Sequence, residues 1–288
     1  MKMSVECVYC VVRQMDGYYS RFEADDDKRM AFMRKVCEGI SQSTDDSSAP
    51  LVNATLMEII KQEVGQDDLF EEEKHVYNQA ILKMQERIQA HIDGADDKLY
   101  RALQYAMTGN YIDFGTTAGV SPEKLNELIE EAPDIDLGDT YDCLKADIEK
   151  AKSLVYLLDN CGEVVFDKMC IAEIKALYPD LKITAIVRGL PAYNDVTMED
   201  AREVGLTDIV SVVGNGDYVP GTILSRISQE AKTLIEQADV IISKGMGNYE
   251  TISGCGLNIY YLLLCKCDRF MREFSKPRLA SVFKAEKM

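Results

Sequence analysis

Four polar side chains that can bind a metal ion or carry a proton follow an apolar run at residues 154–158. They are Asp159, Asn160, Glu163 and Asp167. Their oxygens are hard ligands, which suit Mg²⁺, Mn²⁺ or a similar cation. Asp and Asn are also common N-cap residues, so the same pattern is typical of an ordinary helix start. Taken alone, this segment indicates either a ligand site or a helix cap.

Two later segments contain groups that suit the same chemistry. Arg188, Asn194 and Asp195 follow a second apolar run at residues 182–187. The tract SKGMGN at residues 243–248 combines Lys244 with two glycines, whose small size lets backbone amides approach an anion. A tight turn with an exposed lysine has the same composition, and the tract matches neither the Walker pattern nor GxGxxG. Carboxylates for a divalent cation and a lysine for phosphate are the two halves of a phosphoryl-transfer site.

The elements that must position these groups alternate between strand and helix after residue 152. Strands are expected at residues 154–158, 182–187, 209–213, 240–243 and 259–265, with helices at 164–177, 198–204 and 228–237. This order predicts an α/β domain with a parallel sheet. The carboxyl ends of parallel strands meet at one edge of the sheet, so we expect Asp159, Asp195 and Lys244 to lie close together.

The first part of the chain has helical periodicity instead. Apolar residues recur at spacings of three and four over 30–40 and 77–92, and further helices are expected at 122–132 and 141–151. A helix start is expected at Asp68, and residues 41–50 are expected to form a loop. Gly109 interrupts the pattern, and Asn110 and Asp113 lie among apolar neighbours there, which predicts a turn. We therefore expect a helical N-terminal domain at residues 1–105 and an α/β metal-binding catalytic domain at residues 106–288.

Composition excludes several classes of protein. The 288 residues are 47% hydrophobic, which is enough for a sizeable core. The formal net charge of -17 argues against nonspecific binding to nucleic acid or anionic lipid, and nothing in the composition indicates an oligomeric state. No apolar run approaches the length of a membrane span, and the start has no signal-peptide core. Nine cysteines at irregular spacing suit reduced thiols, so we expect a cytoplasmic protein.

Cys7 and Cys10 form a CxxC pair, a spacing that can hold a metal or form a redox couple. A structural zinc site usually needs a second pair, for which Cys265 and Cys267 are the candidates. Buried inert thiols are the alternative, since free cysteine behaves as a small hydrophobe. A redox or metal-carrier role for these cysteines therefore stays open.

Three motifs give the chain a resemblance to a known family. They are DNCGEVVFD at residues 159–167, RGLPAYNDVT at 188–197 and SKGMGNYET at 243–251. GNYIDFG at 109–115, DLFEEEKHVYN at 68–78 and the early CVYC add to them. In this order and separation, the motifs make the chain similar to the damage-control phosphatase family, also called domain of unknown function 89. The CVYC resembles the N-terminal CxxC of the prokaryotic branch, and the resemblance spans nearly the whole chain.

The resemblance implies a helical N-terminal part packed on a three-layer α/β/α, Rossmann-like domain with a mostly parallel sheet. It implies metal-dependent hydrolysis of small phosphomonoesters, such as sugar phosphates or damaged phosphometabolites. The cofactor would be a divalent metal ion, with Mg²⁺, Mn²⁺, Co²⁺ and Ni²⁺ as the candidates. The partner would be a small-molecule phosphate ester rather than nucleic acid or a membrane.

Matching positions also assign roles to residues of this chain. The metal would be held by Asp159, Asn160 and Asp195. Lys244 would bind phosphate, together with the turn at Gly247 and Asn248. The rest of the pocket would be lined by Asn110, Asp113, Glu163 and Arg188. Cys161 departs from the family pattern, in which we expect a small residue such as alanine.

In the resulting hypothesis, the cation polarises the phosphate and a bound water, and Lys244 stabilises the developing charge. Either the water attacks phosphorus, or Asp159 attacks as a nucleophile. The sequence favours water, because Cys161 stands two residues after Asp159, where haloacid-dehalogenase enzymes have a second aspartate. Two other functions stay open: a carboxyl methyltransferase, although a glycine-rich cofactor loop is missing, and a sugar-phosphate binding protein without turnover.

Overall fold

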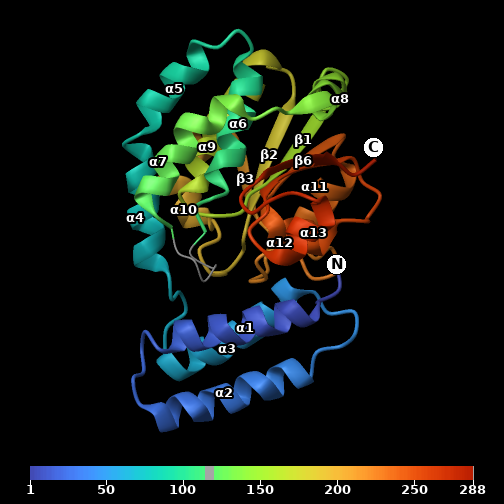
Figure 1. The fold of residues 1–288 in the computed structure, drawn as a ribbon. Coiled ribbons are helices and arrows are strands. Elements are labelled where there is room, and N and C mark those ends of the chain that lie inside the picture. The colour runs from blue at the N-terminus through green and yellow to red at the C-terminus, as the bar shows by residue number, and fades with distance from the viewer. Residues whose placement is uncertain (114–119, 288) are drawn as a thin grey trace.

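One mixed sheet organises the structure (Figure 1), a computed structural model that describes residues 1–113 and 120–287. Six strands form this sheet within those residues, in the order β3-β2-β1-β4-β5-β6. They are β1 (Ser153–Leu157), β2 (Lys182–Val187), β3 (Ser211–Gly214), β4 (Val240–Lys244), β5 (Ile259–Leu264) and β6 (Ser281–Ala285). The first five run parallel, and β6 pairs antiparallel with β5. The predicted α/β class and mostly parallel sheet are confirmed.

The strands are apolar because helices cover both faces of the sheet. Successive side chains of a strand point to opposite faces, and β1 follows this rule. Leu154 and Tyr156 belong to one apolar cluster, which includes residues of α6 (Lys98–Gly109) and α9 (Glu163–Leu177). Val155 and Leu157 belong to a second cluster, which includes residues of α11 (Gln229–Gln237), α12 (Gly245–Ile252) and α13 (Asp268–Phe274). The result is a three-layer α/β/α arrangement.

Shorter helices complete the α/β part. They are α4 (Glu71–Leu82), α5 (Gln85–Asp93), α7 (Pro122–Glu131), α8 (Gly138–Ile148) and α10 (Met198–Glu203), with 3₁₀ turns η1 (Ala132–Asp134) and η2 (Leu206–Asp208). Side chains cap several of the helix starts. Asp97 accepts a hydrogen bond from Tyr100 N at 3.1 Å and begins α6, and Ser121 accepts one from Lys124 N at 3.2 Å and begins α7.

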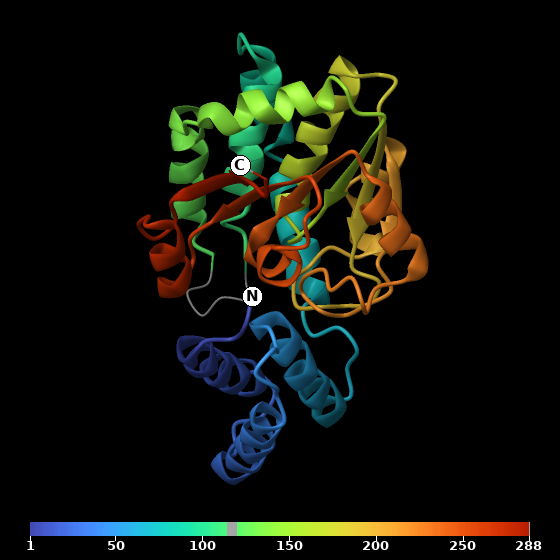
Figure 2. The ribbon, with the colours of Figure 1, turned by 90° about the vertical axis from the view of Figure 1, so that its right-hand side faces the viewer.

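The first three helices form a separate bundle: α1 (Val5–Tyr19), α2 (Asp26–Ser41) and α3 (Ala49–Val64). The bundle has its own apolar cluster, which includes Val11, Phe32 and Leu56. Figures 1 and 2 show the bundle below the α/β part, close to α12. Lys61 Nζ donates to Pro191 O at 2.9 Å, which ties α3 to the loop after β2. The bundle therefore lies at the edge of the sheet where β1, β2 and β4 end.

The predicted domain boundary at residue 105 stays a prediction. Helices α4, α5 and α6 contribute Ile81, Ile88 and Leu99 to the apolar cluster that contains one face of the sheet. We propose from this packing that the boundary lies near Gly65, which ends α3 in a left-handed conformation with φ 73°.

The structure corrects several local predictions. The helix expected over residues 77–92 is two helices, because α4 ends at Leu82 and α5 begins at Gln85. The tract at 243–248 contains a helix start instead of a free turn, since α12 begins at Gly245. Strand β6 and helix α13 were not expected; both are short, and β6 pairs with the rest of the sheet through β5 alone. Phe114 and Gly115, the end of the GNYIDFG motif, lie outside the described residues. In the described ranges, no helix is long and apolar enough to cross a membrane.

Candidate metal and phosphate site

The segment after β1 pairs with the segment after β2 and brings two aspartates together. Val196 N donates to Asp159 O at 2.8 Å, and Asn160 forms an isolated antiparallel bridge with Asp195. In the sheet, β1 lies between β2 and β4, so the strand order reverses there. Open α/β sheets bind their ligands at such a switch point, outside the carboxyl ends of the strands. Asp159, Asn160 and Asp195 lie side by side at this point.

The two aspartates share a buried, negatively charged environment. Asp159 is 7% exposed and Asp195 is 3% exposed. Burial, followed by repulsion from Asp195 and Glu163, raises the pKa of Asp159 well above its ordinary value. Burial also raises the pKa of Asp195 to about 6, although Arg188 opposes the rise. Arg188 Nε donates to Asp195 Oδ2 at 2.6 Å. A cation placed between the carboxylates would remove their repulsion.

Amide side chains fix the orientation of these carboxylates. Asn160 Nδ2 donates to Asp159 Oδ2 and to Glu163 Oε2, both at 2.8 Å. Asn160 Oδ1 accepts from Asn194 Nδ2 at 2.8 Å. Asn110, at the end of α6, donates to the two oxygens of Glu163 at 3.0 and 3.1 Å. The Glu163 carboxylate therefore holds two amides, one of which belongs to the proposed metal ligand Asn160.

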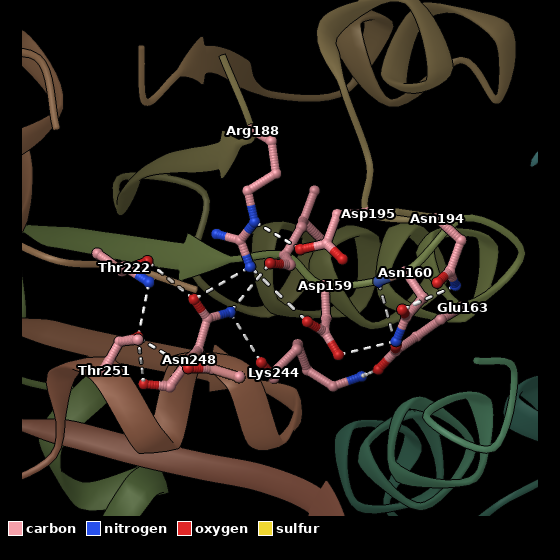
Figure 3. Close-up of polar contacts among 12 residues, drawn as sticks. Asp159, Asn160, Glu163, Arg188, Asn194, Asp195, Thr222, Lys244, Asn248 and Thr251 are labelled. Carbon is pink, nitrogen blue, oxygen red and sulfur yellow. Dashed lines mark hydrogen bonds and ion pairs between the residues drawn. The ribbon is translucent and has the colours of Figure 1, made fainter. Parts of the chain in front are cut away.

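Lys244 ends β4 and points into the protein (Figure 3). Its ammonium group donates to Glu163 Oε1 at 2.6 Å, to Asp167 Oδ1 at 2.7 Å and to Ala106 O at 2.7 Å. These bonds use all three donors of the group. Burial alone would lower the pKa of Lys244, but Asp167 and Glu163 outweigh it and raise the pKa. Direct phosphate binding by Lys244 stays a prediction, and it requires the ammonium group to release one of these partners.

Arg188 and Asn248 connect the two sides of the site. Figure 3 shows Arg188 between Asp195 and Asn248, with Nη2 at 3.3 Å from Asn248 Oδ1. The same Nη2 lies 3.7 Å from Asp159 Oδ1. Asn248 Oδ1 also accepts from Thr222 Oγ1 at 2.8 Å. Because Arg188 is 1% exposed and Asn248 is 0% exposed, their visible role is to hold the carboxylates in place.

The first turn of α12 approaches the aspartates closely. A Cβ atom at Gly245, where φ is +77°, would lie 1.8 Å from Asp159 Oδ2. A Cβ atom at Gly247 would lie 2.2 Å from Pro220 O. Glycine is therefore required for α12 to begin against Asp159. Backbone N–H groups in the first turn of a helix have no intrahelical acceptor, so this turn is suited to an anion.

A cavity of about 130 Å³ lies between the aspartates and the helical bundle. Half of the residues predicted for the site line it: Asp113, Asp159, Asn160, Asp195 and Gly247. The other half, Asn110, Glu163, Arg188, Lys244 and Asn248, are buried and are not among the described residues that line it. Direct substrate contact by this second group stays a prediction.

Sequence reasoning missed a cation beside the cavity. Lys266 is 8% exposed, and its Nζ donates to Asp113 Oδ2 at 2.8 Å. Burial alone would lower the pKa of Lys266, but Asp113, Asp159 and Glu163 raise it. Lys266 follows β5, so the strand-end rule that selected Asp159 and Asp195 would also have selected it. It was missed because the predicted strand extended through Cys265 into an apparently buried cysteine-rich end.

The cysteines do not form the two-pair metal site for which Cys265 and Cys267 were the candidates. Cys7, Cys10 and Cys267 line a second cavity of about 520 Å³, whereas Cys265 is buried with Sγ 3.8 Å from Phe270 O. All nine cysteines are free. Over residues 1–113 and 120–287, no group of three or more His, Cys, Asp or Glu side chains could hold a metal ion. The proposed ligands Asp159, Asn160 and Asp195 differ from such a group because one of them is an amide.

Comparison with known proteins decides the family. The sequence model of the damage-control phosphatase ARMT1-like domain matches residues 3–282. The chain belongs to this family. Two curated members from archaea match it over nearly their whole length. A damage-control phosphatase of Archaeoglobus fulgidus is 32% identical, with 95% of this chain and 95% of that protein covered. A damage-control phosphatase of Pyrococcus horikoshii is 30% identical, with 98% of this chain and 97% of that protein covered.

A solved structure shows the fold of the family. The crystal structure of a DUF89 family protein from Pyrococcus horikoshii matches with a TM-score of 0.88 and 28% sequence identity. The match covers 99% of each chain. The fold is therefore that of the DUF89 family, and the family and its members support a phosphatase role for this chain.

Proposed function

We propose that this damage-control phosphatase hydrolyses small phosphate monoesters with a divalent cation held by Asp159, Asn160 and Asp195. The observation that carries the proposal is the pair of buried aspartates, which come from adjacent strand ends and line one cavity. Burial and repulsion raise the pKa of both carboxyl groups, so each ionised form needs a nearby positive charge. Arg188 supplies part of that charge, and a divalent cation would supply the rest.

The donor set fits such a cation. The hydrogen bonds to the two aspartates use Oδ2 of each, which leaves Oδ1 of each for a ligand role within the described residues. With the amide oxygen of Asn160, the set consists of hard oxygens, which suit Mg²⁺ or Mn²⁺ and also accept Co²⁺ or Ni²⁺. Asn160 Oδ1 accepts from Asn194 in the structure, so metal binding would share or replace that bond.

The phosphate group has two candidate partners near the cavity. Met246 and Gly247 line the cavity in the first turn of α12, where free N–H groups and the helix dipole favour an anion. Lys266 places a positive charge next to Asp113, which also lines the cavity. We therefore assign phosphate binding to the α12 turn and Lys266, and we assign Lys244 to the support of Glu163.

Different residues of the chain would have different roles in hydrolysis. When bound, the cation would polarise a phosphoryl oxygen and offset the charge that develops on it. Arg188 holds Asp195 in position, and Glu163 holds the amide of Asn160. Asp159 is placed either to accept a proton from an attacking water or to attack phosphorus itself. Water is favoured, because Cys161 is fully buried and offers no acid two residues after Asp159.

Phosphate release tests this proposal. Metal-free protein is incubated with a panel of small phosphomonoesters, with each of the four cations in turn, and inorganic phosphate is measured. We expect release that requires the cation and stops when a chelator is added. A labelled methyl donor in parallel tests the carboxyl methyltransferase alternative. Ester binding without phosphate release under any cation would favour a binding protein and overturn the proposal. The cytoplasmic location and the absence of nucleic-acid and membrane partners stay predictions.

A further inference from the structure

The cavity next to the aspartates has a second wall, which the helical bundle provides. Gln14 of α1 and Asn53 of α3 line this wall, and Tyr193 from the loop after β2 lines the cavity beside them. Two polar atoms here are buried without a hydrogen-bond partner in the described part of the chain. They are Tyr193 Oη and Asn53 Oδ1. Buried polar atoms in folded proteins almost always have a hydrogen-bond partner. Two unpartnered atoms on residues that line one cavity therefore indicate that a bound ligand supplies the missing partners.

The backbone at Tyr193 strengthens this reading. Its φ is 51°, a left-handed conformation that a bulky residue rarely adopts. Strain of this kind persists where the surrounding structure enforces it, and it concentrates at binding sites. The ring is fixed by Tyr18, at a centroid distance of 5.6 Å, and by Phe70, at 6.1 Å. A phenylalanine ring could make the same packing contacts, so packing does not explain why this residue carries a hydroxyl group.

The orientation of Asn53 is also set by the bundle. Its Nδ2 faces Gln14 Oε1 at 3.5 Å, which directs the amide so that Oδ1 is the atom without a partner. Two residues that line the cavity thus carry one hydroxyl donor, at Tyr193, and one amide acceptor, at Asn53, without a partner in the described part of the chain. A substrate hydroxyl can accept from the first and donate to the second, whereas an alkyl group can do neither.

We propose that Tyr193 Oη and Asn53 Oδ1 form a leaving-group subsite, which binds hydroxyl groups on the alcohol part of the phosphate ester. The subsite rests on the proposed function, because its residues line the same cavity as the proposed metal ligands. It assigns substrate selection to the helical bundle and to the loop before Asp195. A site built to bond a hydroxyl discriminates strongly against the analogue that lacks it, because its own polar groups then stay unpaired.

Matched pairs of esters test the subsite. Glycerol 3-phosphate, ribose 5-phosphate and glucose 6-phosphate are compared with n-propyl, n-pentyl and n-hexyl phosphate, which have the same carbon counts without the hydroxyls. We expect the wild-type protein to prefer at least one hydroxylated ester. Tyr193→Phe should raise the KM of that ester by about tenfold and leave the alkyl esters within about twofold, as expected for the loss of one substrate hydrogen bond. Asn53→Leu should act in the same direction.

Tyr19→Phe is the matched control, since Tyr19 is buried in the bundle and stacks on Phe32 at a centroid distance of 4.1 Å. Tyr19→Phe should change neither the KM of the hydroxylated esters nor the KM of the alkyl esters. Equal effects of Tyr193→Phe on hydroxylated and alkyl esters would show a structural role and overturn the proposal, as would a wild-type preference for the alkyl esters.

Failure of the proposed function is distinguishable from failure of the subsite. If no ester releases phosphate, calorimetric binding of the same six esters still measures the discrimination. Loss of that discrimination in Tyr193→Phe supports the subsite without turnover, and its absence in the wild type rejects the subsite.

Discussion

Lys244 and Glu163 form an ion pair that solvent does not reach. Nζ lies 2.6 Å from Oε1, and both side chains are 0% exposed. Asp167 completes the group at 2.7 Å from the same Nζ. Since Glu163 also accepts from the amide of Asn160, the lysine acts on the proposed metal site through Glu163. The lysine that the sequence presents as a phosphate ligand donates to two carboxylates and a backbone carbonyl in the structure.

Lys244→Met should destabilise the protein by about 3–5 kcal/mol, because it leaves two buried carboxylates without their cation. Urea unfolding at neutral pH measures the loss. Adding Glu163→Gln and Asp167→Asn to the variant should recover much of it, since the unpaired charges are then gone. Lys266→Met is the control from another buried lysine, which has one carboxylate partner within salt-bridge distance. A Lys244→Met protein of wild-type stability with a raised KM for every ester would identify Lys244 as a phosphate ligand instead.

Asp195→Asn should preserve the fold while weakening the metal site. The substitution keeps the shape of the side chain and removes one ligand charge, so phosphate release at limiting Mn²⁺ should fall by at least about a hundredfold. Excess Mn²⁺ should restore part of the activity. The measurement is phosphate release against metal concentration, with circular dichroism as the check on folding. Unchanged activity at limiting metal would remove Asp195 from the ligand set.

Gly245→Ala should abolish most of the activity, because its Cβ atom would lie 1.8 Å from Asp159 Oδ2. Relief of this overlap must move Asp159 or α12, and a misplacement of about 1 Å in a reacting group costs about a hundredfold in rate. Gly254 is a matched control: its φ of +83° is also left-handed, but a Cβ atom there meets nothing within 4 Å. Gly254→Ala should therefore cost roughly 1 kcal/mol in stability and leave turnover unchanged. Equal activity in the two variants would contradict the close approach of α12 to Asp159.

Glu250 should make stability depend on pH. Burial raises its pKa from 4.5 to about 7, although Arg269 and the amino terminus oppose the rise. The folded chain therefore keeps this proton to a higher pH than the unfolded chain, and the free energy of unfolding falls as the pH rises from about 4.5 to about 7. The side chain of the Glu250→Gln variant cannot titrate. As the pH rises from 4.5 to 8, the free energy of unfolding of this variant should therefore increase by up to about 3 kcal/mol relative to that of the wild type. Urea unfolding of both proteins across this range measures the gain, and a constant difference would contradict the raised pKa.

The sequence predicted the placement of the aspartates because two local signals agreed. An apolar run long enough for a buried strand ends at Asp159, and a second ends at Arg188, shortly before Asp195. The strand-end rule then brings these ends together without knowledge of any side-chain contact. The same rule failed to show which way Lys244 points. That direction depends on Glu163 and Asp167, which lie four residues apart on one face of α9 and attract the ammonium group inward.

The subsite residues could not be found in this way. Asn53 lies on a helix of the bundle, and its distance from the aspartates depends on how the bundle packs against the sheet edge. Tyr193 lies within the motif RGLPAYNDVT, but only the structure shows its positive φ and its unpartnered hydroxyl. Strand β6 was missed for a related reason: the five residues of this edge strand join the sheet through pairing with β5, a contact that no local pattern specifies.

One measurement tests the proposed metal site most directly: Mn²⁺ binding and phosphate release are followed in the same samples. Equilibrium dialysis of metal-free wild-type protein against Mn²⁺ should give a binding curve that coincides with the rise in phosphate release. The double variant Asp159→Asn, Asp195→Asn should bind at least about a hundredfold more weakly and release no phosphate, whereas the exposed Asp180→Asn should match the wild type. Full phosphate release from the metal-free wild type, or unchanged Mn²⁺ binding in the double variant, would contradict the proposed metal site.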